Sequence, residues 1–182
     1  IYDISNLKDL KEVKGNLVVF NTSIADLTPF RNLTKVGGFL VVNYNSELNR
    51  LLGLDFIGTV GEGLIIENNP VLDDLNDLSS LQSFTSLSIS GNLKSISKLK
   101  ETSVTKLKSL SIINCELLES LEGLNNIDSI IKNEEGFASF TIASNGQLKN
   151  IDALTNLLFC DSDLNIVSNN ELTNCCSISH LV

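Results

Sequence analysis

The fold of this chain is decided by the stretch at residues 40–48, LVVNYNSEL, which follows the pattern Leu-x-[Ile/Val]-x-x-Asn-x-x-Leu. The pattern returns, with small variations, along the whole chain of 182 residues. Its seven copies begin at Leu17, Leu40, Leu64, Leu87, Leu110, Phe140 and Leu164, with spacings of 23, 24, 23, 23, 30 and 24 residues. Such a period is typical of solenoids, whose repeats bury their apolar sides against their neighbours. We expect a single domain over residues 1–182 with about seven coils, in which residues 160–182 form a C-terminal cap.

Two apolar patterns within each repeat predict how a coil is built. The alternation seen at Leu40 and Val42 predicts a short strand with these two side chains inward. After the strand, apolar residues recur at every third position, as at Leu48, Leu51, Leu54, Ile57 and Val60. A strict period of three fits neither an α-helix nor a strand, although short 3₁₀ turns are compatible with it.

The connection between consecutive strands is always a whole coil, so the strands must be parallel. The sequence therefore predicts a right-handed, parallel β-helix-like repeat solenoid. It should contain one continuous parallel sheet of about seven short strands and little helix.

A polar residue recurs at the corner after each strand. The column comprises Asn45, Asn69, Asn92, Asn145 and Asn169, with Asn21 one position early in the first repeat and Cys115 in the fifth. An inward carboxamide can donate to and accept from the backbone of its own coil and the adjacent one. We interpret the column as a structural ladder, because a single ligand would not need the same residue in coil after coil.

These repeats resemble a known family. The strings that carry the resemblance are Leu107-x-x-Leu110-x-Ile112-x-Asn114-Cys115 and Phe84-x-x-Leu87-x-Ile89-x-x-Asn92. They are similar to the leucine-rich repeat, in which Asn or Cys occupies the ladder position. The Asn-x-x-Leu ending and the period look more like the receptor L-domain variant, found in insulin-receptor-type and epidermal-growth-factor-receptor-type ectodomains and in microbial and fungal surface proteins. The resemblance covers residues 15–181 and implies an extracellular, non-enzymatic recognition domain.

The chain departs from the hormone-receptor ectodomains, because it has no cysteine-rich module and no cysteine-bonded first repeat. A microbial surface protein is therefore the better match. The first residue is Ile1 with no signal-like segment ahead of it, so we expect a mature fragment of a secreted or cell-surface protein.

Charge and hydropathy exclude several classes of partner. The chain has 13 Lys and Arg against 22 Asp and Glu, a net charge of −9. Such a balance disfavours nucleic acids and anionic lipid surfaces, whose binding usually needs a basic patch. No uninterrupted apolar run of about 18 residues occurs, so we expect no direct membrane insertion.

The residues give no sign of an enzyme, a cofactor or a metal centre. His180 is the only histidine and lies next to the C-terminus, where a solvent-facing tail is the simpler interpretation. Asp73, Asp74 and Asp77 share one turn and could in principle bind Ca²⁺ or hydrolyse a glycosidic bond. We interpret them as a solvated acidic edge.

Three of the four cysteines, Cys160, Cys175 and Cys176, cluster near the end of the chain. The register of the repeat predicts that Cys160 and Cys175 face the core of the last coil. A disulfide from Cys160 to either Cys175 or Cys176 would hold a terminal coil that has no further neighbour. The alternative is that all three are small buried hydrophobes, and the spacing alone does not decide. We expect Cys115 to be a free, buried thiol.

The outward positions of the strands change character along the chain. The first three repeats carry the candidate partner-binding residues Val18, Phe20, Phe39, Val41, Asn43, Tyr44, Ile65 and Glu67. Later repeats carry Ser86, Ser88, Ser90, Ser109, Ser111, Ser139 and Thr141. An exposed apolar patch usually marks an interaction surface. A protein or glycan partner, a second copy of the chain, or a further segment of the same protein could cover it.

We therefore expect an extracellular recognition or adhesion module that works through its open sheet face. The alternative is a structural spacer of a larger cell-surface protein, in which the patch is an intramolecular joint. The long interval after Leu110 exceeds the 24-residue interval that follows it by 30 − 24 = 6 residues, and we place the excess at residues 132–136. This insertion is either a functional loop or tolerated length variation.

Overall fold

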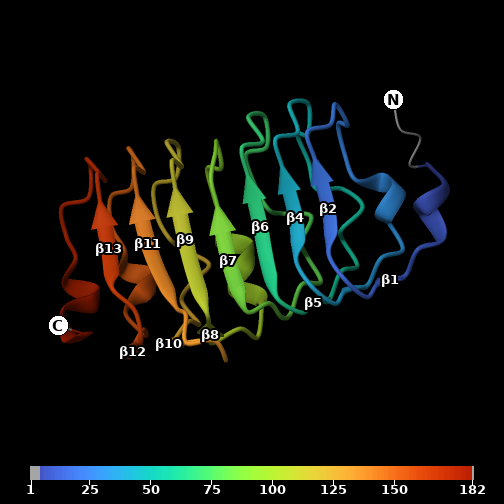
Figure 1. Ribbon diagram of the computed structural model, residues 1–182. Helices are drawn as coiled ribbons and strands as arrows, with labels where there is room; N and C mark the ends of the chain where they lie inside the picture. Colours follow the sequence, from blue (N-terminus) through green and yellow to red (C-terminus); the bar gives the residue numbers. More distant parts are fainter. Residues whose placement is uncertain (1–4, 182) are drawn as a thin grey trace.

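The computed structural model describes residues 5–181, which form a parallel β-solenoid (Figure 1). The main sheet has seven parallel strands in the order β13-β11-β9-β7-β6-β4-β2. Their bounds are β2 (Leu17–Phe20), β4 (Leu40–Asn43), β6 (Gly63–Glu67), β7 (Ser86–Ile89), β9 (Ser109–Ile113), β11 (Ser139–Ala143) and β13 (Leu164–Val167). The register pairs equivalent repeat positions, such as Leu17 with Leu40 and Leu40 with Leu64. The predicted solenoid is confirmed.

Two small parallel sheets accompany the main one and were not predicted. The first contains β1 (Glu12–Val13), β3 (Lys35–Val36) and β5 (Thr59–Val60). The second contains β8 (Lys106–Leu107), β10 (Ser129–Ile130) and β12 (Phe159–Cys160). Each of these strands has two residues, too few to produce a visible alternation in the sequence.

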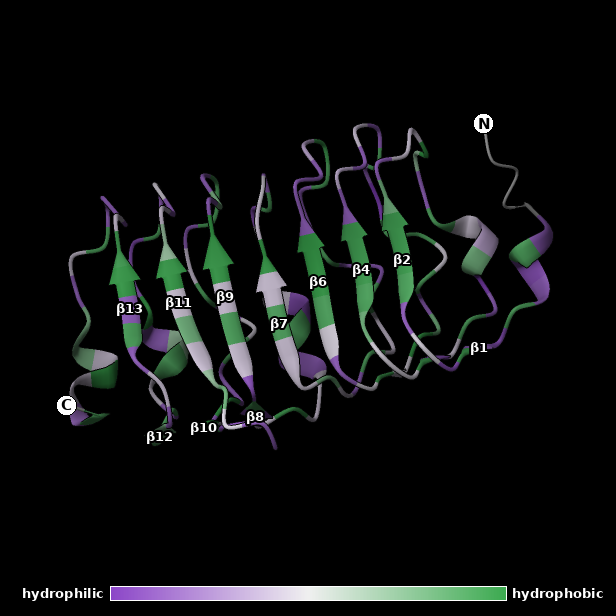
Figure 2. Ribbon diagram, in the orientation of Figure 1, coloured by the Kyte–Doolittle hydropathy of each residue, from purple (hydrophilic) through white to green (hydrophobic). Residues whose placement is uncertain are grey.

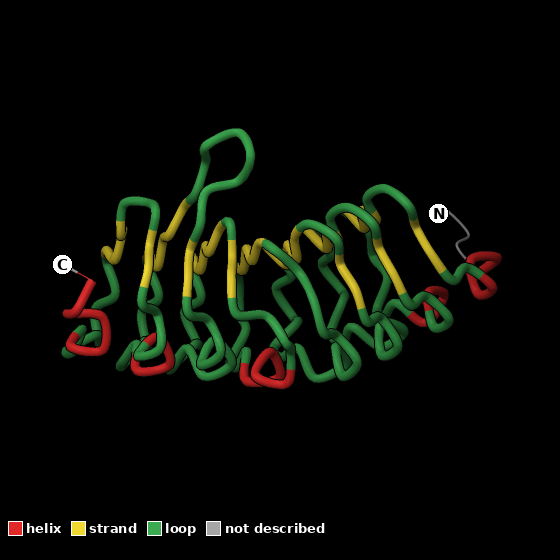
Figure 3. Tube along the Cα trace, turned by 90° about the horizontal axis from the view of Figure 1, so that it is seen from below, coloured by secondary structure: helices red, strands yellow, loops and turns green. Residues whose placement is uncertain are grey.

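The helical segments of residues 5–181 are all short 3₁₀ turns, as the period of three indicated. They are η1 (Ser5–Asp9), η2 (Thr28–Phe30), η3 (Ser97–Glu101), η4 (Asp152–Leu154) and η5 (Cys176–Leu181). Figure 3 shows them on the side of the coils opposite the main sheet. In the described part of the chain, no helix is both long and apolar enough to cross a membrane.

The core consists of aliphatic columns that run through all the coils. Leu40, Leu48, Leu54 and Leu64 are completely buried, and each repeats its position from coil to coil. Burying one such side chain contributes roughly 1.5–3 kcal/mol. The coils are therefore held together by stacked Leu, Ile and Val side chains, and the strand face opposite these residues is left for solvent or for a partner.

Every strand of the main sheet ends in a corner residue with positive φ, four positions after the anchor. These residues are Asn21, Tyr44, Asn68, Gly91, Asn114, Ser144 and Ser168. Asn21 was predicted as a ladder member, which is wrong: it holds the left-handed position, with φ of 52°. Thr22 takes its place in the ladder, where its backbone N and Oγ1 donate to Oδ1 of Asn45 at 3.1 and 2.7 Å.

The ladder has two stretches. In the first, Asn45 donates from its backbone N to Oδ1 of Asn69. In the second, the backbone N atoms of Cys115 and Asn145 donate to Oδ1 of Asn145 and Asn169, respectively. The Nδ2 atom of each of these Asn residues also donates to a backbone carbonyl in the main-sheet strand of the preceding coil.

Asn92 interrupts the ladder, contrary to the prediction. Its side chain is exposed and donates to the carbonyl of Pro70 at 2.7 Å. The reason is a shorter corner: buried Leu93 follows Asn92 directly, whereas Leu72 follows Asn69 by three residues. With Leu93 already turned into the core, the neighbouring Asn92 side chain faces outward.

Candidate recognition surface

The eight candidate partner-binding residues lie together around the first three strands of the main sheet. The register places Val18 beside Val41 and Val41 beside Ile65. Six of the eight form what we call the apolar patch: Val18, Phe20, Phe39, Val41, Tyr44 and Ile65. Figure 2 shows the change along the sheet, from hydrophobic β2, β4 and β6 to paler β7, β9 and β11.

The most exposed part of the patch is at its N-terminal side. Val18, Phe20 and Tyr44 have 56%, 55% and 54% of their surface exposed. The rings of Phe20 and Tyr44 meet edge to face, with centroids 5.8 Å apart and an interplanar angle of 74°. Aromatic pairs in this geometry gain about 0.5–1.5 kcal/mol beyond the area they bury. The two rings therefore form an ordered, solvent-facing aromatic pair.

A hydrogen-bonded polar border runs along the patch. Glu67 accepts from Oγ of Ser88 at 2.5 Å and from Nδ2 of Asn43 at 3.4 Å. Asn43 in turn accepts from Nδ2 of Asn68 at 3.3 Å. The predicted residues Asn43 and Glu67 thus belong to one network, which restricts their side chains before any partner arrives.

Phe39 lies at the lower edge of the patch and is half-buried. Its ring occupies the space above Gly63, where an added Cβ would come within 2.6 Å of Cε1. A side chain at position 63 would displace the ring. The glycine therefore positions an aromatic group on the outer face of the sheet.

The insertion forms a loop where the sequence placed it. Residues 131–138 connect β10 to β11 with eight residues, whereas residues 161–163 connect β12 to β13 with three. Asn133 organises the loop, because its Oδ1 accepts from the backbone N of Glu135 and of Phe137 at 3.0 and 2.8 Å. Gly136 supplies a turn with φ of 85°. Figure 3 shows a loop projecting on the sheet side of the coils.

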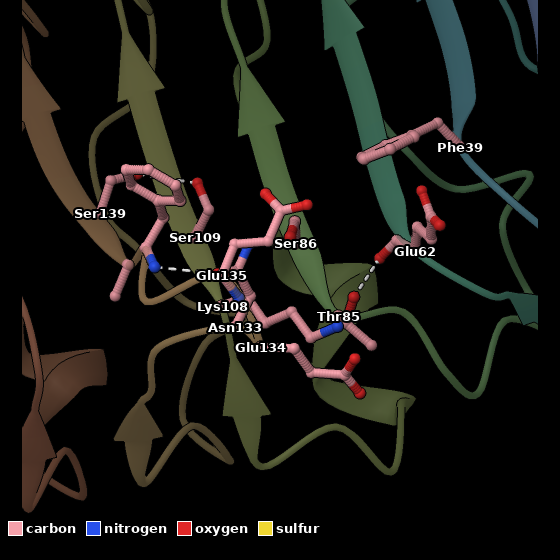
Figure 4. A pocket seen from close by; sticks show the side chains of 12 residues that line it. Phe39, Glu62, Thr85, Ser86, Lys108, Ser109, Asn133, Glu134, Glu135 and Ser139 are labelled. Carbon is pink, nitrogen blue, oxygen red and sulfur yellow. Dashed lines mark hydrogen bonds between the residues drawn. The ribbon is translucent and has the colours of Figure 1, made fainter.

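A groove of about 820 Å³ lies between this loop and the sheet, and we call it the loop groove. Phe39 and Glu62 line one end (Figure 4). Glu134, Glu135 and Phe137 of the loop also line the groove. The floor carries Thr85, Ser86, Lys108, Ser109 and Ser139. Sequence reasoning identified the loop and the serine columns separately but not the groove between them. The sequence indicates the groove only through the position of Ser139, which lies three residues after the predicted insertion at residues 132–136.

All four cysteines are within the described residues and all are free thiols, so the open alternative of a cap disulfide is not realised here. Cys160 is half-buried, with its Sγ 3.4 Å from Oγ of Ser162. Cys175 and Cys176 are exposed. The prediction that Cys175 faces the core is wrong, because Ile178 of η5 supplies the buried side chain in the final coil.

Cys115 is buried and free, as expected. Burial raises its pKa from the usual 9.0 to about 12, with a smaller contribution in the same direction from Glu116. Its Sγ lies 3.8 Å from the carbonyl oxygen of Ile89, the position that an Asn side chain reaches in other coils. The thiol therefore substitutes for a carboxamide in the ladder.

The remaining candidates for chemistry have structural partners. Asp73 pairs with Lys94 at 3.0 Å. Asp77 is buried and pairs with Arg50 at 2.7 Å, so the interpretation as a solvated edge is wrong for this residue. His180 is exposed, yet its Nε2 lies 2.6 Å from the carbonyl oxygen of Leu157. Across residues 5–181, no three His, Cys, Asp or Glu side chains are grouped so that they could hold a metal ion.

Comparison with known proteins adds no relative: no family model matches the chain, and no curated protein is detectably similar to it. The likeness to leucine-rich repeats and receptor L-domains therefore depends on the repeat pattern described above.

Proposed function

We propose that this domain is a non-enzymatic extracellular recognition or adhesion module of leucine-rich-repeat or receptor L-domain type, which binds a protein through the apolar patch. The observation that carries the proposal is the exposure of Val18, Phe20 and Tyr44 side by side on a sheet face. Large apolar side chains in such a group are typical of interaction sites.

The composition of the patch favours a protein partner over a glycan. Aromatic residues are enriched in protein interfaces, where an apolar centre is surrounded by a polar rim. The patch has this arrangement, with Phe20 and Tyr44 beside the hydrogen-bonded Asn43 and Glu67. The aliphatic side chains of Val18 and Val41 offer no hydrogen bonds to a sugar. The patch also lies on a sheet, so little ordering is needed on binding.

A second function, that of a spacer in a larger surface protein, is favoured by one observation. A hollow of about 650 Å³ opens at the N-terminal end of the solenoid and is lined by Leu7, Leu10, Ile24 and Phe30. Phe20 lines this hollow and also belongs to the patch. A neighbouring domain could cover both surfaces at once, and the patch would then be an internal joint.

The test compares three forms of the domain as bait for chemical cross-linking in cell-surface extracts. The first is the wild type, the second is Phe20→Asp with Val41→Asp, and the third is Ser111→Asp with Asn165→Asp on β9 and β13. The third is a matched control, because it adds the same charge to the same sheet face outside the patch. A protein cross-linked by the wild type and the control but lost from the patch variant supports recognition. Equal capture by all three overturns it, and a wild-type dimer in sedimentation assigns the patch to self-association instead.

A further inference from the structure

The loop groove has a chemistry different from that of the apolar patch. We propose that it is a second binding site, which shares only Phe39 with the apolar patch, for a neutral oligosaccharide that lies across the strands between the insertion loop and the serine columns. This inference does not depend on protein binding by the apolar patch. Each variant in the test below changes residues of at most one of the two sites, so their effects can be told apart.

The floor and the rim of the groove offer many hydrogen-bonding groups. Thr85, Ser86, Ser109 and Ser139 contribute hydroxyls. That of Thr85 already donates to the carbonyl of Glu62, and those of Ser109 and Ser139 share one hydrogen bond, but every one of these oxygens can still accept. Glu62, Glu134 and Glu135 add carboxylates, and Lys108 adds an ammonium group. Among residues 5–181, none of these four charged side chains takes part in an ion pair. Sugar hydroxyls both donate and accept, so this mixture suits them.

The serine residues of the floor lie at equivalent positions of neighbouring strands. Ser86 pairs with Ser109, and Ser109 with Ser139, in the register of neighbouring parallel strands. The strands of a sheet lie about 4.8 Å apart, which is close to the length of one hexose unit in an extended chain. Successive sugar units that cross β7, β9 and β11 would therefore meet Ser86 and then the hydrogen-bonded hydroxyls of Ser109 and Ser139.

Two aromatic rings line the groove, one from the segment before β4 and one from the loop. Phe39 is fixed above Gly63, and Phe137 at the loop is 69% exposed. The apolar C–H face of a sugar ring packs on such aromatic groups, and a loop already ordered by Asn133 lowers the cost of holding Phe137 in place. An exposed phenylalanine in an ordered loop that overhangs hydroxyls is thus explained by a ligand with both polar and apolar faces.

A basic peptide is the competing occupant, because three carboxylates exceed the single ammonium group. The observations favour the neutral chain for two reasons. Lys108 lies on the floor among the hydroxyls, where it would repel a cation, and the hydroxyl column itself carries no charge. Glu134 and Glu135 belong to the loop and Glu62 to the segment before β6, so none of the carboxylates is on the strands that carry the hydroxyl column.

The test measures binding of defined glucose, mannose and N-acetylglucosamine oligomers to the wild-type domain by calorimetry and by NMR shift perturbation. We expect at least one neutral hexasaccharide to bind, with about tenfold loss of affinity for the corresponding disaccharide and for Phe137→Ala. Phe56→Ala is the matched control, because Phe56 is 64% exposed and does not line the groove. This variant and Phe20→Asp should bind like the wild type.

Three results would overturn the proposal. One is the absence of binding by every neutral oligomer. Another is binding that Phe137→Ala leaves unchanged. The third is preferential binding of hexalysine that is lost in a Glu134→Gln, Glu135→Gln variant, which would make the groove a site for basic peptides. Equal protein capture by the wild type and the patch variant would overturn the protein-binding proposal and leave the sugar result unaffected, so the two proposals fail separately.

Discussion

The side-chain oxygen of Asn69 accepts two hydrogen bonds from Asn45, one from the backbone N at 3.0 Å and one from Nδ2 at 3.1 Å. Asn69 also donates from its own Nδ2 to the carbonyl of Val42 at 2.9 Å. Both carboxamides are buried, so water cannot replace these bonds. The corner at Asn45 is thus fixed by the coil beside it.

Asn69→Ala should destabilise the domain by about 2–4 kcal/mol, because it leaves the buried amide of Asn45 and the carbonyl of Val42 without partners. Asn92→Ala is the matched control: it is the same substitution at the same repeat position, but Asn92 is exposed. Its cost should stay below about 1 kcal/mol. Urea unfolding measures both, and equal losses would contradict the ladder.

Gly53→Ala should lower the unfolding free energy by roughly 3 kcal/mol or more. Gly53 has φ of 108°, and an added Cβ would lie 2.0 Å from the carbonyl oxygen of Leu27 in the adjacent coil. Gly15→Ala is the comparison, since a Cβ there meets nothing within 4 Å. Equal thermal stability of the two variants would contradict the close approach of Gly53 to the backbone of Leu27.

Thiol reagents should separate the cysteines at mildly alkaline pH. Cys175 and Cys176 are exposed and should be labelled in the folded protein, whereas Cys115 should react only after denaturation. Mass spectrometry of the labelled peptides identifies the sites. Rapid labelling of Cys115 in the folded state would show that the fifth coil is open.

The raised pKa of Cys115 also has a consequence for stability. Between pH 9 and about 12 the unfolded chain loses this proton while the folded thiol keeps it. The unfolding free energy of the wild type should therefore fall as the pH rises through this range. The fall should be less steep for Cys115→Ala, which lacks the thiol. Identical pH profiles for the two proteins would contradict the shift.

Asn133→Ala should loosen the insertion loop without affecting the solenoid. The variant removes the acceptor for the backbone N of Glu135 and of Phe137, both on an exposed loop. Hydrogen exchange at residues 134–137 should accelerate, while the urea midpoint stays unchanged. Exchange that is unaltered in the loop would show that other contacts fix it.

The repeat made the fold predictable. Anchors such as Leu40 and Leu64 recur at nearly constant spacing, and the core of a solenoid depends mainly on that spacing. The ladder was predictable where Asn-x-x-Leu is complete, as at Asn45. It failed at Asn92, where the motif is two residues short, and at Asn21, where a corner position that tolerates positive φ also prefers Asn.

The candidate site was predictable only in part. Alternation along a strand identifies outward residues such as Val18 and Val41, and parallel register then brings them together. The loop groove depends on the path of residues 131–138 above Ser109 and Lys108, which no local pattern specifies. Cys175 was misplaced because the last coil has no following repeat to maintain the register.

The most direct test of recognition through the sheet face is saturable binding of the fluorescently labelled domain to intact cognate cells. We predict binding that is lost with Phe20→Asp and Val41→Asp and retained with Ser111→Asp and Asn165→Asp, while circular dichroism shows all three proteins folded. Equal binding by the patch variant and the wild type would contradict it.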